Sequence, residues 1–103
     1  MTRRQALLRK AAVQDIGDAV AHYQGEGSSA LAGQFVTELE RAFDNFCRHP
    51  ESGSPRYGQE LGIPDLRSWP LSTFPHVVFY RPTEGQIDVA RVLHPRRDIA
   101  SWL

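Results

Sequence analysis

The clearest pattern in the sequence lies in residues 31–46, LAGQFVTELERAFDNF. Its apolar residues recur every three or four positions, which is the spacing of one face of an α-helix. They are Leu31, Phe35, Leu39, Ala42 or Phe43, and Phe46. Pro50 follows the pattern and ends it, because proline cannot continue a helix. The stretch therefore predicts an amphipathic helix that packs one face against a core.

A second amphipathic helix is predicted just before this one. The apolar residues that share its face are Val13, Ile16, Val20 and Tyr23. Glycines at positions 25 and 27 separate the two patterns, so the helices form an antiparallel hairpin joined by a short turn. Residues 5–8, a short apolar run between basic side chains, predict a strand before the hairpin.

Strand patterns replace helical ones in the second half of the chain. Residues 50–65 hold three prolines and three glycines, which predicts an irregular connection. The predicted strands are residues 66–69, 76–81 and 86–94, with a turn at 82–85. Pro70 cuts the first of them, which is typical of an edge strand. Residues 96–103 predict a last helical turn or two, with Ile99, Trp102 and Leu103 returning to the core.

The predicted order is β-α-α-β-β-β with a short C-terminal helix. Because the two helices are consecutive, the chain is not an alternating βαβ protein. We expect an α+β fold in which a helical hairpin covers one face of a small, mostly antiparallel sheet. A length of 103 residues fits one compact domain, residues 1–103.

Composition excludes several classes of protein. No apolar run approaches the ~18 residues of a membrane span. The first ten residues hold too few apolar side chains for the core of a signal peptide, so we expect a cytoplasmic protein. The single cysteine, Cys47, excludes an intramolecular disulfide and a cysteine zinc cage. The four histidines lie on different predicted elements without metal-ligand spacing, so we expect no metal and no cofactor.

The net charge of zero conceals a segregation along the chain. Residues 1–10 carry four positive charges and no acid, whereas residues 11–55 carry two arginines and seven acids. Residues 56–103 carry six arginines and five acids. One interpretation is a pair of helices with solvated acidic faces. The other is a cationic surface formed where the two basic chain ends meet, suited to an acidic partner.

Arginines are the main candidates for function. Arg67, Arg81 and Arg91 fall in successive predicted strands, and three further polar residues follow the last strand. Those three are His94, Arg96 and Arg97. Because alternate residues of a strand share a face, several of these side chains can lie on one side of the sheet. Such a cluster binds the phosphates of RNA or DNA, or the carboxylates of a protein. The alternative is a solvated edge in which the arginines pair with Glu84, Asp88 and Asp98.

The string ARVLHPRRDI at residues 90–99 resembles the C-terminal signature of ParE toxins, within the ParE/RelE superfamily of type II toxin–antitoxin systems. Other pieces resemble the family in the same order. They are AAVQDI at residues 11–16, residues 35–50 as the second helix, DLR at 65–67 and FPHVVFY at 74–80. In DLR, an aspartate stands where the family usually has glycine. The resemblance spans nearly the whole chain.

The resemblance implies a toxin that binds DNA gyrase, blocks replication and is neutralised by a ParD-like antitoxin in a hetero-oligomer. The implied contact residues are Arg67, Arg81, Arg91, His94, Arg96, Arg97 and Trp102. RelE-like relatives are instead ribosome-dependent mRNA endoribonucleases, for which Arg67, His94 and Arg96 would be the catalytic residues here. Residues 48–65 contain none of the lysines that RelE-like toxins use, which favours gyrase binding over catalysis. A pure interaction role and direct nucleic-acid binding stay open.

Overall fold

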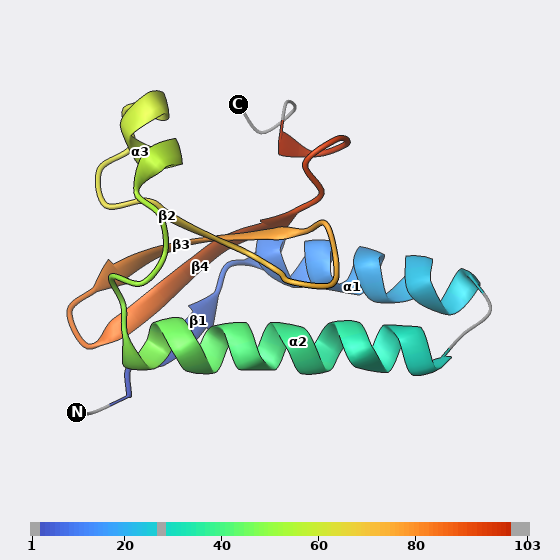
Figure 1. Ribbon diagram of the computed structural model, residues 1–103. Helices are drawn as coiled ribbons and strands as arrows, with labels where there is room; N and C mark the ends of the chain where they lie inside the picture. Colours follow the sequence, from blue (N-terminus) through green and yellow to red (C-terminus); the bar gives the residue numbers. More distant parts are fainter. Residues whose placement is uncertain (1–2, 27–28, 100–103) are drawn as a thin grey trace.

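The computed structural model describes residues 3–26 and 29–99 of the chain (Figure 1). Its elements are β1 (Gln5–Leu8), α1 (Lys10–Gly25), α2 (Ser29–Arg48), α3 (Arg56–Leu61), β2 (Arg67–Pro70), β3 (Val77–Thr83) and β4 (Gln86–Leu93). The strands form one sheet in the order β1-β4-β3-β2. β1 runs parallel to β4, and the other two pairs are antiparallel. The predicted α+β fold is confirmed, with α3 as an additional helix.

The helical hairpin of α1 and α2 covers one face of the sheet (Figure 1). The predicted face of α2 is confirmed, because Phe35, Leu39 and Phe46 are all buried in the core beneath the sheet. The ring of Phe46 stacks on that of Tyr80 in β3, with centroids 4.1 Å apart. Burial of these large side chains is the main source of stability for a domain of this size.

At three of its four positions the predicted face of α1 packs against the core. The exception is Val13, which is 56% exposed, and the buried face also includes Ala12 and Ala19. The helix lies against both α2 and β4, and alanine side chains allow the close approach that this crowded position requires. Apolar spacing therefore predicted the helix and most of its buried face, but it did not indicate the two buried alanines.

The opposite face of the sheet has a small core of its own. Leu66, Phe79, Leu93 and Ile99 are buried there beneath α3 and the segment that follows β4. The prediction of an irregular connection over residues 50–65 was wrong for residues 56–61, which form α3. The helix packs tightly, since a Cβ atom on Gly58 would lie 2.6 Å from the carbonyl oxygen of Leu66.

The last strand in the sheet order, β2, is an edge strand as its proline predicts. Ser54 covers part of this edge through two backbone hydrogen bonds with Ser68, each 2.9 Å long. After β4 the chain turns at residues 95–98, and Ile99 returns to the core as predicted. The rest of the predicted C-terminal helix, including Trp102, lies outside the described residues.

Candidate functional site

The chain reverses direction after β4 in a tight turn at residues 94–98, here called the His94 turn. The carbonyl oxygen of His94 accepts hydrogen bonds from the amides of Arg97 and Asp98, at 3.2 and 2.9 Å. In return, the amide of His94 donates to Oδ2 of Asp98 at 2.9 Å, and the amide of Arg96 donates to Nδ1 of His94 at 3.1 Å. The turn is thus held by its own polar groups, while the side chains of Arg96 and Arg97 are exposed.

Arg91 lies just before this turn and faces α1. Its Nε and one terminal nitrogen donate to the two carboxylate oxygens of Asp15, at 2.8 and 2.9 Å. The amide of Val92 also donates to Asp15, at 3.0 Å. The Asp15 side chain is only 11% exposed. The side-chain hydrogen bond between Arg91 and Asp15 raises the pKa of the Arg91 guanidinium. The pair therefore fixes α1 against β4, and Arg91 has a structural partner within the fold.

Two histidines lie side by side near the turn. The rings of His76 and His94 are 5.4 Å apart between centroids and perpendicular to each other. His76 is 3% exposed, and burial, followed by the effect of His94 and then of Arg97, lowers its pKa to about 4. Burial first and Arg97 second also lower the pKa of His94. Both imidazoles are consequently neutral at pH 7.

A pocket of about 150 Å³ opens between α1 and the His94 turn. It is lined by Asp15, Asp18, Ala19, His76, Val92, Arg97 and Asp98. Within the described residues, Nδ1 of the buried His76 has no hydrogen-bond partner. Three carboxylates, one guanidinium and one neutral imidazole therefore meet around a single small space, which we call the His76 pocket.

Arg67 lies elsewhere, at the start of β2. Its guanidinium donates to the carbonyl oxygens of Glu51 and Gly53, at 3.0 and 2.8 Å. The hydroxyl of Tyr80 accepts from the amide of Gly53 at 2.8 Å and donates to the carbonyl oxygen of Pro50 at 2.9 Å. Arg67 and Tyr80 together thus hold residues 50–53 against the sheet, and Arg67 does not meet the His94 turn.

Arg81 is also separate from the turn. It lies opposite Asp88 in the register of β3 and β4, but the guanidinium of Arg9 takes this carboxylate through two hydrogen bonds of 3.0 and 2.7 Å. In the described part of the chain, the buried Nε of Arg81 has no partner. The seven residues named from sequence therefore divide: Arg91, His94, Arg96 and Arg97 come together, Arg67 and Arg81 lie apart, and Trp102 is outside the described residues.

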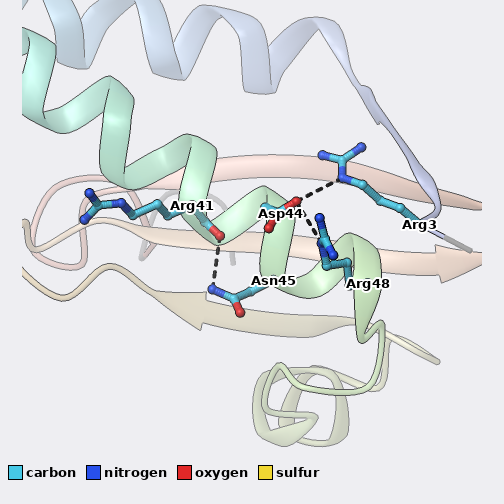
Figure 2. A network of polar contacts seen from close by, with 5 residues as sticks. All are labelled: Arg3, Arg41, Asp44, Asn45 and Arg48. Carbon is cyan, nitrogen blue, oxygen red and sulfur yellow. Dashed lines mark hydrogen bonds and ion pairs between the residues drawn. The ribbon is translucent and has the colours of Figure 1, made fainter. Parts of the chain in front are cut away.

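The basic N-terminal segment contacts the acidic helical hairpin directly. Oδ1 of Asp44, near the end of α2, accepts from Nε of Arg48 at 3.1 Å and from Nε of Arg3 at 3.3 Å (Figure 2). These hydrogen bonds, that of Arg48 above all, lower the pKa of Asp44. Arg41 is one turn away, and its guanidinium points away from Asp44 (Figure 2). Ion pairs from both basic ends, Arg3–Asp44 and Arg91–Asp15, therefore reduce the charge separation seen along the sequence.

Other reactive groups are placed for structure. Cys47 is buried, and burial raises the pKa of its thiol, which keeps it protonated. Among residues 3–26 and 29–99, no three histidine, cysteine or acidic side chains are grouped to hold a metal ion. None of the helices described here is long and apolar enough to span a bilayer.

Three polar residues that line the His76 pocket had no site role predicted from the sequence, namely Asp15, Asp18 and His76. Asp15 and Asp18 carried no assigned role there, although their spacing of three residues places them on one helical face. That spacing was the available signal. His76 showed no sign of a role in the sequence, because its environment depends on α1, β3 and the His94 turn meeting in space.

Comparisons with known proteins agree with this fold. Residues 6–99 match the family model described as "ParE toxin of type II toxin-antitoxin system, parDE". Toxin ParE1 of Mycobacterium tuberculosis, from strains CDC 1551 / Oshkosh and ATCC 25618 / H37Rv, is 44% identical over 69 residues. This alignment covers 66% of the present chain and 65% of the relative, just under two thirds of the relative's length.

A solved structure shares the fold at low sequence identity. A chain of the "Chromosomal ParDE TA system from P. aeruginosa" matches with a TM-score of 0.73 and 16% identity, over 89% of the present chain and 96% of that chain. At this identity the match supports the fold alone, whereas the family model covers nearly the full length of the sequence. The chain therefore belongs to the ParE family, the toxins of parDE type II toxin–antitoxin systems.

Proposed function

We propose that this ParE-type toxin acts by binding DNA gyrase and blocking replication, without an enzymatic step of its own. The observation that carries the proposal is the separation of Arg67 from His94 and Arg96, the three residues that a ribonuclease would need together. His94 follows Leu93, which pairs with Val77 in β3, whereas Arg67 pairs with Tyr80. His94 therefore lies two strands away from Arg67 across the sheet. Along the strands the two residues are about four residues apart, or roughly 13 Å at 3.3 Å per residue.

Polar groups of two of these residues, Arg67 and His94, are also occupied within the fold. A terminal nitrogen of Arg67 already donates to two carbonyl oxygens, and Nδ1 of His94 already accepts from the Arg96 amide. General acid–base catalysis requires the proton-transfer group to lie within hydrogen-bond reach of the reacting atoms. One phosphate cannot reach both Arg67 and His94 in this arrangement, which favours binding over catalysis.

The proposed contact surface is the His94 turn. Arg96 and Arg97 are exposed on a turn whose backbone is held by its own hydrogen bonds, so a partner that binds them need not order the backbone of the turn. Arginine side chains on a rigid base are common energetic centres of protein interfaces. A ParD-like antitoxin would place acidic side chains against the same turn, within a cytoplasmic hetero-oligomer.

The test compares two targets with the same purified toxin. In one reaction the toxin is incubated with gyrase, ATP and supercoiled plasmid, and in the other with translating ribosomes and a defined mRNA. We expect linear plasmid to accumulate in the first and the mRNA to stay intact in the second. Codon-dependent cuts in the mRNA with unaffected gyrase would reject the proposal, and inactivity in both reactions would leave only an interaction role.

The contact surface is tested by a double substitution, Arg96→Ala with Arg97→Ala. We expect at least a tenfold loss in gyrase trapping and in antitoxin affinity measured by calorimetry, as for removal of charged interface residues. The matched control is Arg56→Ala, which removes an exposed arginine on α3 whose guanidinium pairs with Glu60. Equal losses in both variants would show that net positive charge matters and the turn does not.

A further inference from the structure

The His94 turn contains a hydrogen bond that only a neutral histidine can accept. Nδ1 of His94 accepts the backbone amide of Arg96 at 3.1 Å. A neutral imidazole has one nitrogen with a proton and one without, so this bond requires the proton of the ring to lie on Nε2. In the imidazolium ion both ring nitrogens are donors. Protonation of His94 therefore removes the acceptor and sets two N–H groups against each other.

His94 occupies a position in the turn where a side chain with an oxygen is common. Its carbonyl oxygen accepts the amide of Arg97, which makes His94 the first residue of the turn and Pro95 the second. Proline is favoured at the second position, and aspartate, asparagine or serine at the first. The oxygens of those side chains accept the amide two residues later, as Nδ1 does here. Asparagine and serine keep this acceptor at every pH, whereas histidine loses it when the ring is protonated.

The other hydrogen bonds of the turn do not use the imidazole. The carbonyl oxygen of His94 accepts the amides of Arg97 and Asp98. Oδ2 of Asp98 accepts the amide of His94 in return. Protonation of the ring leaves these donors and acceptors in place. We therefore expect it to release the backbone of Arg96 selectively, while the chain still reverses direction after β4.

Several charged or titratable groups determine when the ring of His94 is protonated. Those near it are His22 of α1, His76 just before β3, and Arg96, Arg97 and Asp98 of the turn. Burial is the first cause that lowers the pKa of His94; the three cations act in the same direction, and the carboxylate of the turn opposes them. The pKa of His76 is about 4, so that ring stays neutral over the upper part of the titration of His94.

We propose that His94 is a positioning residue for Arg96, and that the contact surface of the turn is complete only while this imidazole is neutral. The inference rests on the proposed function in taking the His94 turn as the surface that a protein partner binds. With the ring neutral, the exposed side chain of Arg96 starts from a fixed backbone. With the ring protonated, a partner must remove the proton before the same surface forms. The affinity then falls by at most about tenfold for each pH unit below the pKa of His94.

The first experiment uses the whole toxin alone, labelled with 15N, so that its outcome is independent of gyrase and of the antitoxin. NMR follows the ring nitrogens of His94 and the backbone amide of Arg96 between about pH 7 and about pH 5. At pH 7 we expect a scalar coupling across the hydrogen bond, between the Arg96 amide nitrogen and Nδ1 of His94. It should disappear with the midpoint at which His94 is protonated. The proposal is overturned if Nδ1 carries a proton at pH 7, or if the Arg96 amide does not follow the titration of His94.

A substitution then separates the titration of His94 from other effects of acid. His94→Asn places a side-chain oxygen close to the position of Nδ1 and keeps an acceptor at every pH, so the Arg96 amide signal should lose its pH dependence. The matched control is His49→Asn, which removes an exposed histidine just after α2. In this control the transition of Arg96 should persist. Equal pH dependence of the Arg96 amide in the two variants would contradict the positioning role.

The second experiment asks whether binding follows the same proton. Gyrase trapping by the wild-type toxin, His94→Asn and His49→Asn is compared at pH 7 and at about pH 6, so that the pH dependence of gyrase itself cancels. We expect trapping to fall more steeply on acidification for the wild type and His49→Asn than for His94→Asn. The same fall in all three proteins would overturn the link between His94 and binding. An absence of trapping by all three would contradict the gyrase proposal, and the NMR titration would still decide the role of His94.

Discussion

The two ends of the sheet both carry arginines, but the arginines have different partners. At the start of β2 the Arg67 guanidinium turns inward onto two carbonyl oxygens, where it joins Tyr80 in holding residues 50–53. Beyond the end of β4, the guanidinium groups of Arg96 and Arg97 are exposed while their backbone holds the turn. The difference teaches that an arginine in a family motif has a structural or a binding role according to the acceptors within its reach.

The largest effect is expected at the structural end. Tyr80→Ala removes a fully buried ring stacked on Phe46 and two hydrogen bonds to residues 50–53, so we expect a loss of about 3–5 kcal/mol in the free energy of unfolding. Urea denaturation followed by circular dichroism measures it. Tyr80→Phe keeps the ring and should cost only about 1–2 kcal/mol. If Tyr80→Ala costs less than about 1–2 kcal/mol, the contacts of Tyr80 with Phe46 and residues 50–53 do not anchor the fold.

The binding end should make stability depend on pH. The folded-state pKa of His76 is about 4, lowered from 6.5 by burial and by the charges of His94, Arg97 and His22, with Asp98 opposing. Because the folded pKa is the lower one, the unfolded chain binds more protons between these values. Stability is therefore full above pH 6.5 and falls by about 3 kcal/mol toward pH 4. The free energy of unfolding, measured by urea denaturation across this range, should lose part of that slope in His76→Gln.

A smaller loss of stability is expected for the ion pair that joins Asp15 in α1 to Arg91 in β4. Asp15→Asn removes the charge that the 27% exposed Arg91 side chain faces, and should lower the free energy of unfolding by about 2–3 kcal/mol. Asp18→Asn, one turn later on the same helix, is the control and should change it by less than about 0.5 kcal/mol. Thermal and urea unfolding measure both. Equal losses would show that the helix dipole, and not the ion pair, carries the effect.

The smallest effect on stability separates the two kinds of arginine most clearly. Arg67→Met keeps the apolar stem and loses the carbonyl contacts, so about 1–2 kcal/mol of stability should be lost. The Arg96→Ala, Arg97→Ala variant should change stability by less than about 0.5 kcal/mol while toxicity in cells falls. If Arg67→Met at equal folded concentration loses as much toxicity, the assignment of Arg67 to structure is wrong.

The sequence predicted an element of the fold where the pattern that marks it is local or repeats over many residues. The buried face of α2 was predictable because burial follows the helical period over its whole length, and Pro70 marked the edge strand by lacking an amide hydrogen. α3 was not, because six residues with a glycine are too short to show a period. Its position depends on contacts that only the folded chain contains, the packing of Tyr57 and Leu61 on the second core and the close approach of Gly58 to Leu66.

The candidate site was predictable in part for the same reason. The His94 turn is local, so its residues were named together from a contiguous string. The partner of Arg91 is Asp15, 76 residues earlier, and no local pattern in the sequence joins them. The role of His76 likewise comes from three segments that are far apart in the chain. The residues that carry candidate chemistry were thus recognisable in the sequence, whereas the residues that contact them in the folded structure were not.

The parallel pairing of β1 with β4 has a consequence for the order of folding. Among the described residues β1 pairs with β4 alone, Gln5 lying opposite Gln86, and the Arg9–Asp88 pair closes the same junction. Pairings between residues so far apart in the chain form slowly. The β3–β4 hairpin, whose strands are joined by a short turn, is therefore expected to form before β1 docks beside it.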